Sequence, residues 1–165
     1  MIFLGIDPGT AITGYGLIRE EGSSLRAVAY GTITTPPGLA LPQRLVLLHR
    51  ALGDLIQLHR PASAAVEQIF FSRNARTALA VGHARGVVLM TLAQAGLPVT
   101  EYTPLEVKQA VTGYGRADKR QIQEMVRVLI GLPQIPKPDD AADALAIAIC
   151  HLHSSRIRDL ARDAP

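Results

Sequence analysis

The sequence is poor in cysteine and in long apolar runs, and both scarcities exclude classes of protein. Cys150 is the only cysteine, so no disulfide can form within the chain. A reducing compartment suits such a chain, and a small buried hydrophobe is the simplest role for Cys150. No apolar segment is long enough to span a bilayer, and the first residues lack the basic start of a signal peptide. We therefore expect a cytoplasmic protein with no membrane partner.

Acidic residues are missing from a long internal stretch. Between Gln68 and Thr100 the chain has no Asp or Glu, although it has Arg73, Arg76 and Arg85 there. A second basic group follows at Lys108, Arg116, Lys119, Arg120 and Arg127. With a net charge of +3, this distribution favours a polyanionic partner such as nucleic acid, and a solvated basic surface is the alternative.

The pattern of apolar residues predicts an α/β fold. Strands are predicted over 1–7, 13–21, 25–34, 62–70 and 99–102, and helices over 41–60, 74–95, 104–111, 119–130 and 139–153. Short glycine-containing links make the first three strands antiparallel, and helix and strand alternate after them. We therefore predict a mixed five-stranded sheet with helices on both faces. Residues 1–155 are expected to form one domain, and 156–165 a polar, disordered tail.

Two predicted strands end on a carboxylate. Asp7 ends the apolar run in "FLGIDPGT", and Glu67 ends "SAAVE". If a long helical crossover joins these strands, they lie parallel and adjacent, with both carboxylates at one edge of the sheet. The alternatives are a turn-initiating Asp7 before Pro8–Gly9 and a salt-bridged strand end at Glu67.

A third acidic motif, "PDDAADALAIAIC", opens a helix that from Ala141 to Cys150 is apolar on every side except at Asp143. Asp140 and Asp143 are three residues apart and share one face. Helix capping is an alternative role, but Asp139 is expected to provide the cap. Four converging carboxylates repel one another unless a cation compensates. Oxygen ligands suit Mg²⁺ or Mn²⁺ rather than zinc, and His151 and His153 do not have the spacing of a zinc pair.

Four motifs resemble, in order and spacing, the Holliday junction resolvases of the RuvC type. They are "GIDPGTAITGYG", "VEQIFFSRNARTALAVGHARG", "EVKQAVTGYGRADKRQIQEMV" and "DDAADALAIAI", and the likeness covers about residues 2–153. The resemblance implies the ribonuclease H-like fold, a homodimer, Mg²⁺ dependence and cleavage of four-way DNA junctions by paired symmetric nicks, in recombination and repair. It also implies a branch-migration motor as a partner.

The resemblance also assigns roles to residues. The acidic tetrad of metal ligands falls on Asp7, Glu67, Asp140 and Asp143, the wedge aromatic on Phe70, and DNA contacts on Lys108 and Lys119. We expect Lys119 to assist catalysis by offsetting charge on the phosphate. The remaining expected DNA contacts, which come from the basic and polar composition, are Arg73, Asn74, Arg76, Arg116 and Arg120. Gly9, with Gly14 and Gly16 nearby, is expected to let DNA approach the backbone, and a structural need for positive φ is the alternative.

A stripe of small residues, Ala78, Gly82 and Gly86, marks one face of the helix predicted over 74–95. Together with the resemblance, this stripe predicts the dimer interface, and close packing onto the sheet is the alternative. A C₂ dimer would supply the two active sites that a nearly two-fold symmetric junction needs.

Three functions compete with junction resolution. An ATPase of the actin and sugar-kinase type shares the fold and a similar "GIDPGT" loop, but it needs two such domains around its nucleotide. The chain also lacks a P-loop, and "GYGRAD" lacks the third glycine of a dinucleotide fingerprint. The second competing function is that of a ribosomal-RNA-processing nuclease of the same fold, and the third is that of a catalytically inactive DNA-binding module.

Overall fold

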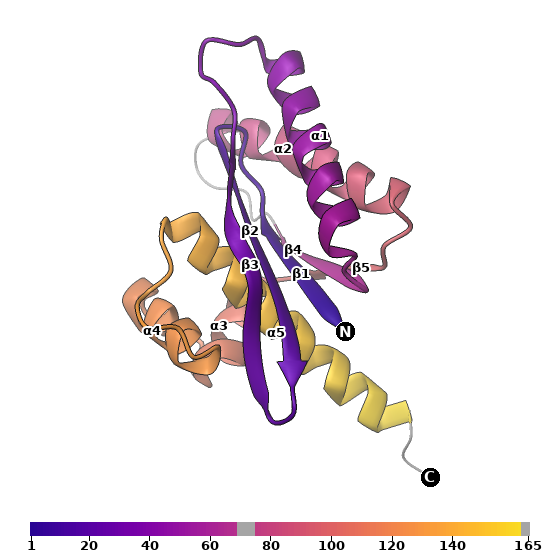
Figure 1. The fold of residues 1–165 in the computed structure, drawn as a ribbon. Coiled ribbons are helices and arrows are strands. Elements are labelled where there is room, and N and C mark those ends of the chain that lie inside the picture. Colours follow the sequence, from indigo (N-terminus) through magenta and orange to yellow (C-terminus); the bar gives the residue numbers. More distant parts are fainter. Residues whose placement is uncertain (69–74, 163–165) are drawn as a thin grey trace.

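Five strands form one mixed sheet in the order β3-β2-β1-β4-β5 (Figure 1). A computed structural model describes residues 1–68 and 75–162, with side chains over 1–68 and 78–157. The strands are β1 (Ile2–Asp7), β2 (Ile12–Glu21), β3 (Ser24–Thr34), β4 (Ser63–Glu67) and β5 (Val99–Tyr102). The first three pair antiparallel, whereas β4 pairs parallel with both β1 and β5. The predicted mixed sheet, with its adjacent parallel first and fourth strands, is confirmed.

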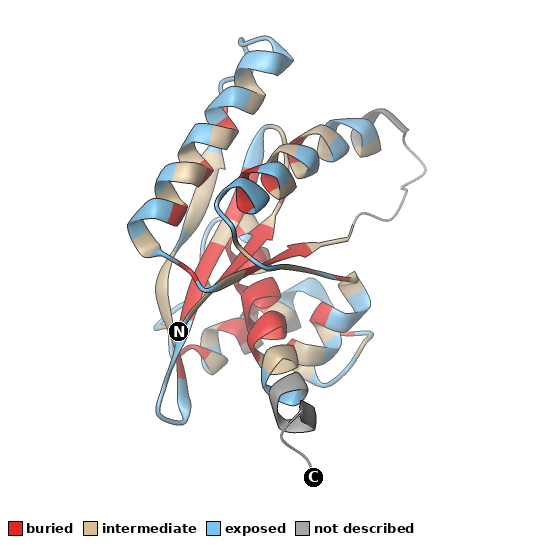
Figure 2. Cartoon of the chain, turned by 90° about the vertical axis from the view of Figure 1, so that its right-hand side faces the viewer, coloured by how far each residue is buried: buried red, intermediate tan, exposed pale blue. Residues whose placement is uncertain are grey.

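Helices cover both faces of this sheet, as predicted. One layer holds α1 (Leu41–His59) and α2 (Ala75–Gln94), and the other holds α3 (Pro104–Thr112), α4 (Lys119–Leu129) and α5 (Asp139–Arg162). Alternation along each strand builds two cores, because neighbouring side chains point to opposite faces. Leu17 packs with the α1–α2 layer and Ile18 with the α5 layer. Figure 2 shows buried residues concentrated in the sheet and along α5.

Glycines let α5 lie unusually close to β1 and β2. A Cβ added at Gly5 would lie 2.5 Å from the backbone nitrogen of Ala148, and one at Gly16 would lie 2.8 Å from that of Leu145. A Cβ at Gly14 would lie 2.6 Å from the carbonyl carbon of Asp140. The expectation that Gly14 and Gly16 face DNA is therefore wrong, since both face the buried helix. These glycines set the distance between α5 and the strand that carries Asp7.

The long helix α5 continues well beyond its predicted end at His153. Its backbone is helical through Arg162, whereas the sequence predicted a helix only to His153. The sequence from 139 to 164 contains no glycine or proline to stop the helix, and Arg156 forms an ion pair with Glu20 at 3.1 Å. Cys150 is buried here as predicted, and burial raises the pKa of its thiol to about 11. In the described part of the chain, no helix combines the length and apolarity that crossing a membrane requires.

Candidate active site

Carboxylates from three elements line one cleft at the carboxyl ends of β1 and β4. Asp7 and Glu67 are the last residues of these two strands, and Asp143 comes from the second turn of α5. Lys108 of α3 and Lys119 of α4 line the same cleft, whose volume is about 270 Å³. The rest of its wall is largely apolar, formed by Pro104, Val107, Ile122 and Ala146. Three acids and two lysines therefore meet in a partly desolvated space.

Burial and mutual repulsion disfavour the charged forms of these acids. The pKa of Asp7 is raised from 3.8 to about 7, first by burial and then by the charges of Asp143, Glu67 and Asp140. Burial and Asp143 also raise the pKa of Glu67, and Lys108 opposes this shift. Burial raises the pKa of Asp143, against the effect of Lys119. The cleft therefore holds more negative charge than its own lysines stabilise.

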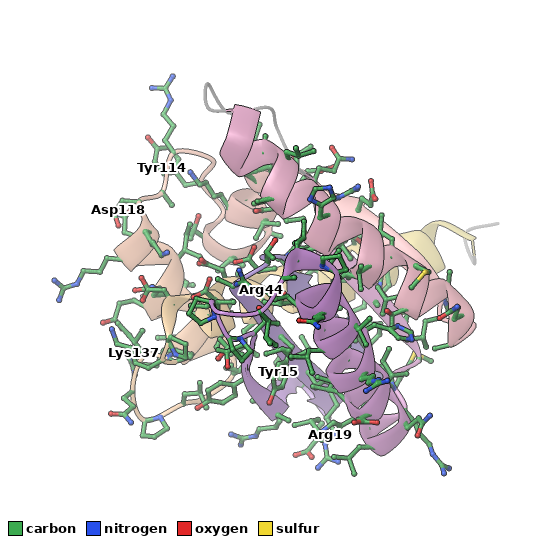
Figure 3. The ribbon with its side chains drawn as sticks, turned by 90° about the horizontal axis from the view of Figure 1, so that it is seen from above. Tyr15, Arg19, Arg44, Tyr114, Asp118 and Lys137 are labelled. Carbon is green, nitrogen blue, oxygen red and sulfur yellow. The ribbon has the colours of Figure 1, made fainter. Side chains whose placement is uncertain are left out.

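Lys119 is held between two acids by the start of α4. Asp118 caps this helix: its Oδ1 accepts from Gln121 N at 2.8 Å, and Gln121 Oε1 accepts from Asp118 N at 2.9 Å. Figure 3 shows Asp118 at the edge of the molecule, where the loop enters α4. Lys119 Nζ lies 3.3 Å from Asp143 Oδ2 and 3.4 Å from Asp139 Oδ2. The expected capping role of Asp139 is wrong, because Asp139 is already the first residue of α5 and binds Lys119.

Asp140 stands apart from the other three acids of the predicted tetrad. It contributes to the raised pKa values of Asp7 and Asp143, so it lies within electrostatic reach of both. It is not among the residues that line the cleft, and its backbone packs against Gly14. Over residues 1–68 and 75–162, no three side chains of His, Cys, Asp or Glu already stand in a metal-holding arrangement. The donor set nevertheless fits a hard divalent cation, because its carboxylates lack sufficient countercharge.

The predicted basic surface divides into paired and exposed residues. Arg85 binds Glu101 of β5, and Arg127 binds Glu124 at 2.8 Å within α4, so both have partners inside the protein. Arg116 and Arg120 are exposed near the start of α4. The predicted DNA contacts Phe70, Arg73 and Asn74 lie outside the described residues, as does the side chain of Arg76.

The loop that follows Asp7 is held by threonine hydroxyls, a feature that the sequence analysis missed. Thr13 is buried, and its Oγ1 donates to Gly9 O at 2.7 Å and accepts from Gly9 N at 3.2 Å. The signal was present in "PGTAIT", because Thr side chains near a Pro-Gly turn often bond to the local backbone.

The small-residue stripe of α2 does not pack against the sheet. Gly82 and Gly86 are exposed, and among the described residues no atom lies within 4 Å of a Cβ built at either position, leaving aside the helix's own backbone. Ala78 is half-buried. The alternative role of the stripe, close packing onto the sheet, is therefore wrong for its two glycines.

The strand order, the parallel β1–β4 pair and the acidic cleft at their ends are those of the ribonuclease H-like fold class. The family model for crossover junction endodeoxyribonuclease RuvC matches residues 3–151. The chain belongs to the crossover junction endodeoxyribonuclease RuvC family.

Named relatives agree with this assignment over almost the whole chain. A crossover junction endodeoxyribonuclease RuvC of Syntrophomonas wolfei is 59% identical over 157 residues, covering 95% of this chain and 91% of the relative. One of Desulfitobacterium hafniense is 61% identical, covering 93% of each chain. The solved structure of T. thermophilus RuvC in complex with Holliday junction substrate superposes with a TM-score of 0.90 at 37% identity, covering 95% of this chain and 96% of that one.

Proposed function

We propose that this chain resolves four-way DNA junctions by paired symmetric nicks, in homologous recombination and repair. The observation that carries this proposal is the cleft in which Asp7, Glu67 and Asp143 meet Lys108 and Lys119. Family membership and the junction-bound relative support the substrate. The proposed catalytic unit is the single domain over residues 1–155.

A divalent cation fits the acids of this cleft, and we propose Mg²⁺, with Mn²⁺ as a substitute. Asp7, Glu67 and Asp143 would hold it together with Asp140. When bound, such a metal activates a water molecule and stabilises the leaving oxygen of a phosphodiester. The donor set supports this assignment because its carboxylates are buried, mutually repelling and composed only of oxygen donors.

The lysines of the cleft would position the scissile phosphate. Lys119 Nζ is 3.3 Å from Asp143 and more than half of its side chain is exposed, so it can turn toward a phosphate oxygen. Lys108 faces Glu67 from α3 and would neutralise the same phosphate from its other side. Cleavage of the bond between phosphorus and the 3′ oxygen leaves a 5′-phosphate and a 3′-hydroxyl.

DNA outside the cleft would be held by surface contacts. The exposed Arg116 and Arg120 lie on the loop and helix that carry Lys119, so they would contact phosphates beside the cut. The wedge role of Phe70 and the contacts of Arg73, Asn74 and Arg76 remain predictions from the sequence.

We also propose a C₂ homodimer formed through α2, with Ala78, Gly82 and Gly86 at its interface. The open space over both glycines supports this placement, because a second helix could approach closely there. Changing Gly82 to Leu should weaken dimerisation by at least about tenfold, because bulk would be added to a close helix contact. Sedimentation velocity over a concentration series measures the effect, with the exposed α1 change Leu58→Ala as the control. If the Gly82→Leu dimer were as stable as that of the wild type, the interface would not lie at Gly82.

One protein partner and one cellular compartment follow from the same proposal. A branch-migration motor is the expected protein partner, and the cytoplasm, where a bacterial cell keeps its DNA, is the expected compartment. Both rest on the family and on the DNA substrate.

One substrate panel tests the proposed function. The protein is incubated with end-labelled four-way junction, duplex DNA, single-stranded DNA and structured RNA, with Mg²⁺ or with EDTA. We expect paired symmetric nicks on the junction alone, and only when Mg²⁺ is present. Cleavage confined to RNA would instead support the ribosomal-RNA-processing function, and a parallel incubation with ATP that shows its turnover without nicking would support the ATPase.

A further inference from the structure

A chain of hydrogen bonds ties the loop after Asp7 to two helices. Thr10 Oγ1 donates to the backbone carbonyl of Ala80 in α2 at 2.6 Å. On the other side, Thr35 Oγ1 donates to Thr10 O at 2.6 Å, and Thr35 N donates to Ala11 O at 3.0 Å. Arg44 Nε of α1 in turn donates to Thr35 Oγ1 at 2.8 Å. Figure 3 labels Arg44 near the start of α1, in the middle of the view from above.

These bonds are local to the catalytic strand end; those of Thr35 are part-buried, whereas the bond from Thr10 to Ala80 is exposed. Thr35 is 6% exposed, so its hydroxyl, which has a donor and an acceptor partner, would be costly to leave unpaired. The loop they hold, residues 8–11, begins directly after Asp7 and leads into β2. We call the hydroxyls of Thr10 and Thr35, with their partners, the threonine brace.

The brace and the acids act on Asp7 from opposite layers of the fold. Asp143 reaches the cleft from α5, on one face of the sheet, whereas α1 and α2 lie on the other face. The loop of residues 8–11 begins where Asp7 ends its pairing with β2, and Thr13 holds its Gly9. The bonds of Thr10 to α2 and, through Thr35, to α1 add a link to the helices of the other layer.

Resting on the proposed function, we infer that Thr10 and Thr35 are positioning residues that fix Asp7 against α2 while the junction is cut. Ala80 lies between Ala78 and Gly82 in the sequence of α2, the helix proposed to form the dimer interface, although it is not on the face of the stripe. The brace therefore sets the distance between Asp7 and the helix through which the two subunits would meet. Because displacements of about 1 Å at a reacting centre cost up to about 100-fold in rate, a loosened loop should slow the chemical step.

The test compares Thr10→Val with Thr10→Ser, since valine keeps the shape of threonine and loses its hydroxyl. Thr10→Val should lower kcat for junction cleavage by about 10- to 100-fold and leave KM and junction affinity within about twofold. Thr10→Ser should restore kcat to within about threefold of the wild type. In DNA-free protein, amide hydrogen exchange over residues 8–11 should be faster in Thr10→Val than in Thr10→Ser.

Thr91→Val is the matched control. Thr91 Oγ1 also donates to a carbonyl of α2, that of Val87 at 2.7 Å, and it bonds to His49 of α1 at 2.8 Å, but it does not touch the loop after Asp7. Its kcat and its loop exchange should equal those of the wild type. Should Thr10→Val fold poorly by circular dichroism, the same pair of measurements on Thr35→Val and Thr35→Ser replaces it.

Three results would overturn the brace. Unchanged kcat in Thr10→Val would show that Asp7 does not need it, and a loss confined to junction affinity would make Thr10 a DNA contact. Unchanged exchange over residues 8–11 would show that the hydroxyl does not hold the loop. If the wild type fails to cut any junction, the proposed function falls, and the exchange result still decides whether the brace exists.

Discussion

Replacing Asp7 by asparagine is expected to abolish junction cutting while junction binding survives. The amide keeps the size and shape of the carboxylate but loses the charge that a divalent cation requires. We expect the cleavage rate to fall by a factor on the order of 1,000 or more, since even second-shell changes at metal sites cost about 10- to 100-fold. Binding should be equal or slightly tighter, because one negative charge facing the DNA is removed.

Single-turnover cleavage with Mg²⁺ and fluorescence-anisotropy binding in EDTA measure the two quantities separately. Asp54→Asn, an exposed change on α1 away from the cleft, is the matched control and should behave as the wild type in both. Cleavage within about tenfold of the wild type would remove Asp7 from the metal site. Loss of cutting and binding together would indicate that Asp7 is needed for the fold instead.

The metal-free protein should become less stable as the pH rises from about 4 to about 8, because of Asp7. Its pKa is raised from 3.8 to about 7 in the folded protein, mainly by burial. A carboxyl with a raised folded pKa is easier to ionise in the unfolded chain, so its ionisation favours unfolding. The loss of stability is absent at a pH below the pKa of Asp7 in the unfolded chain. It grows between that pKa and the pKa in the folded protein, and it is complete at a pH above the folded pKa.

The size of this effect follows from the separation of the two pKa values. At about 1.4 kcal/mol for each pH unit between them, the interval from 3.8 to about 7 corresponds to about 4 kcal/mol as an upper figure. In Asp7→Asn, residue 7 cannot ionise, so the variant should not lose this stability as the pH rises. We therefore expect the variant to match the wild type near pH 4 and to be more stable by about 2–4 kcal/mol near pH 8.

Urea unfolding in EDTA across this pH range gives the comparison, again with Asp54→Asn as the control. Adding Mg²⁺ at about pH 8 should stabilise the wild type and have little effect on Asp7→Asn, because a ligand that binds only the folded state stabilises it. If the unfolding free energies of the wild type and Asp7→Asn changed in parallel at every pH, the raised pKa of Asp7 would be contradicted. The active site is thus expected to lower stability until its metal binds.

Much of the fold could be predicted because its signals are local. Apolar runs, hydrophobic alternation and helical spacing identified the strands and helices that the described residues form, and the crossover rule placed the first strand beside the fourth. The convergence of Asp7 and Glu67 on one sheet edge follows from that adjacency. Asp143 was recognisable as the single charge between Ala141 and Cys150, a stretch that is otherwise apolar and must therefore be buried.

The errors arose where a residue's role depends on a distant partner. Glycine is common where a backbone must stay accessible, yet Gly14 lacks a side chain because the backbone of α5 packs directly against it. That helix lies far away in the sequence. Asp139 stands at the start of a helix, where a capping residue is expected, but it lies within α5 and Lys119 of another helix binds it. Arg85 belongs to an acid-free stretch of sequence, and its acid, Glu101, comes from a neighbouring strand.

The sequence by itself determined the class of this protein, because periodicity and the positions of acids at the ends of apolar runs are properties of short segments. Only the tertiary structure decided how the acids share one cleft with Lys108 and Lys119, and how Thr10 and Thr35 hold the loop beside them. The physical reason is that such contacts join elements from separate layers. Their distances depend on how closely the helices pack onto the sheet, and no local pattern encodes that closeness.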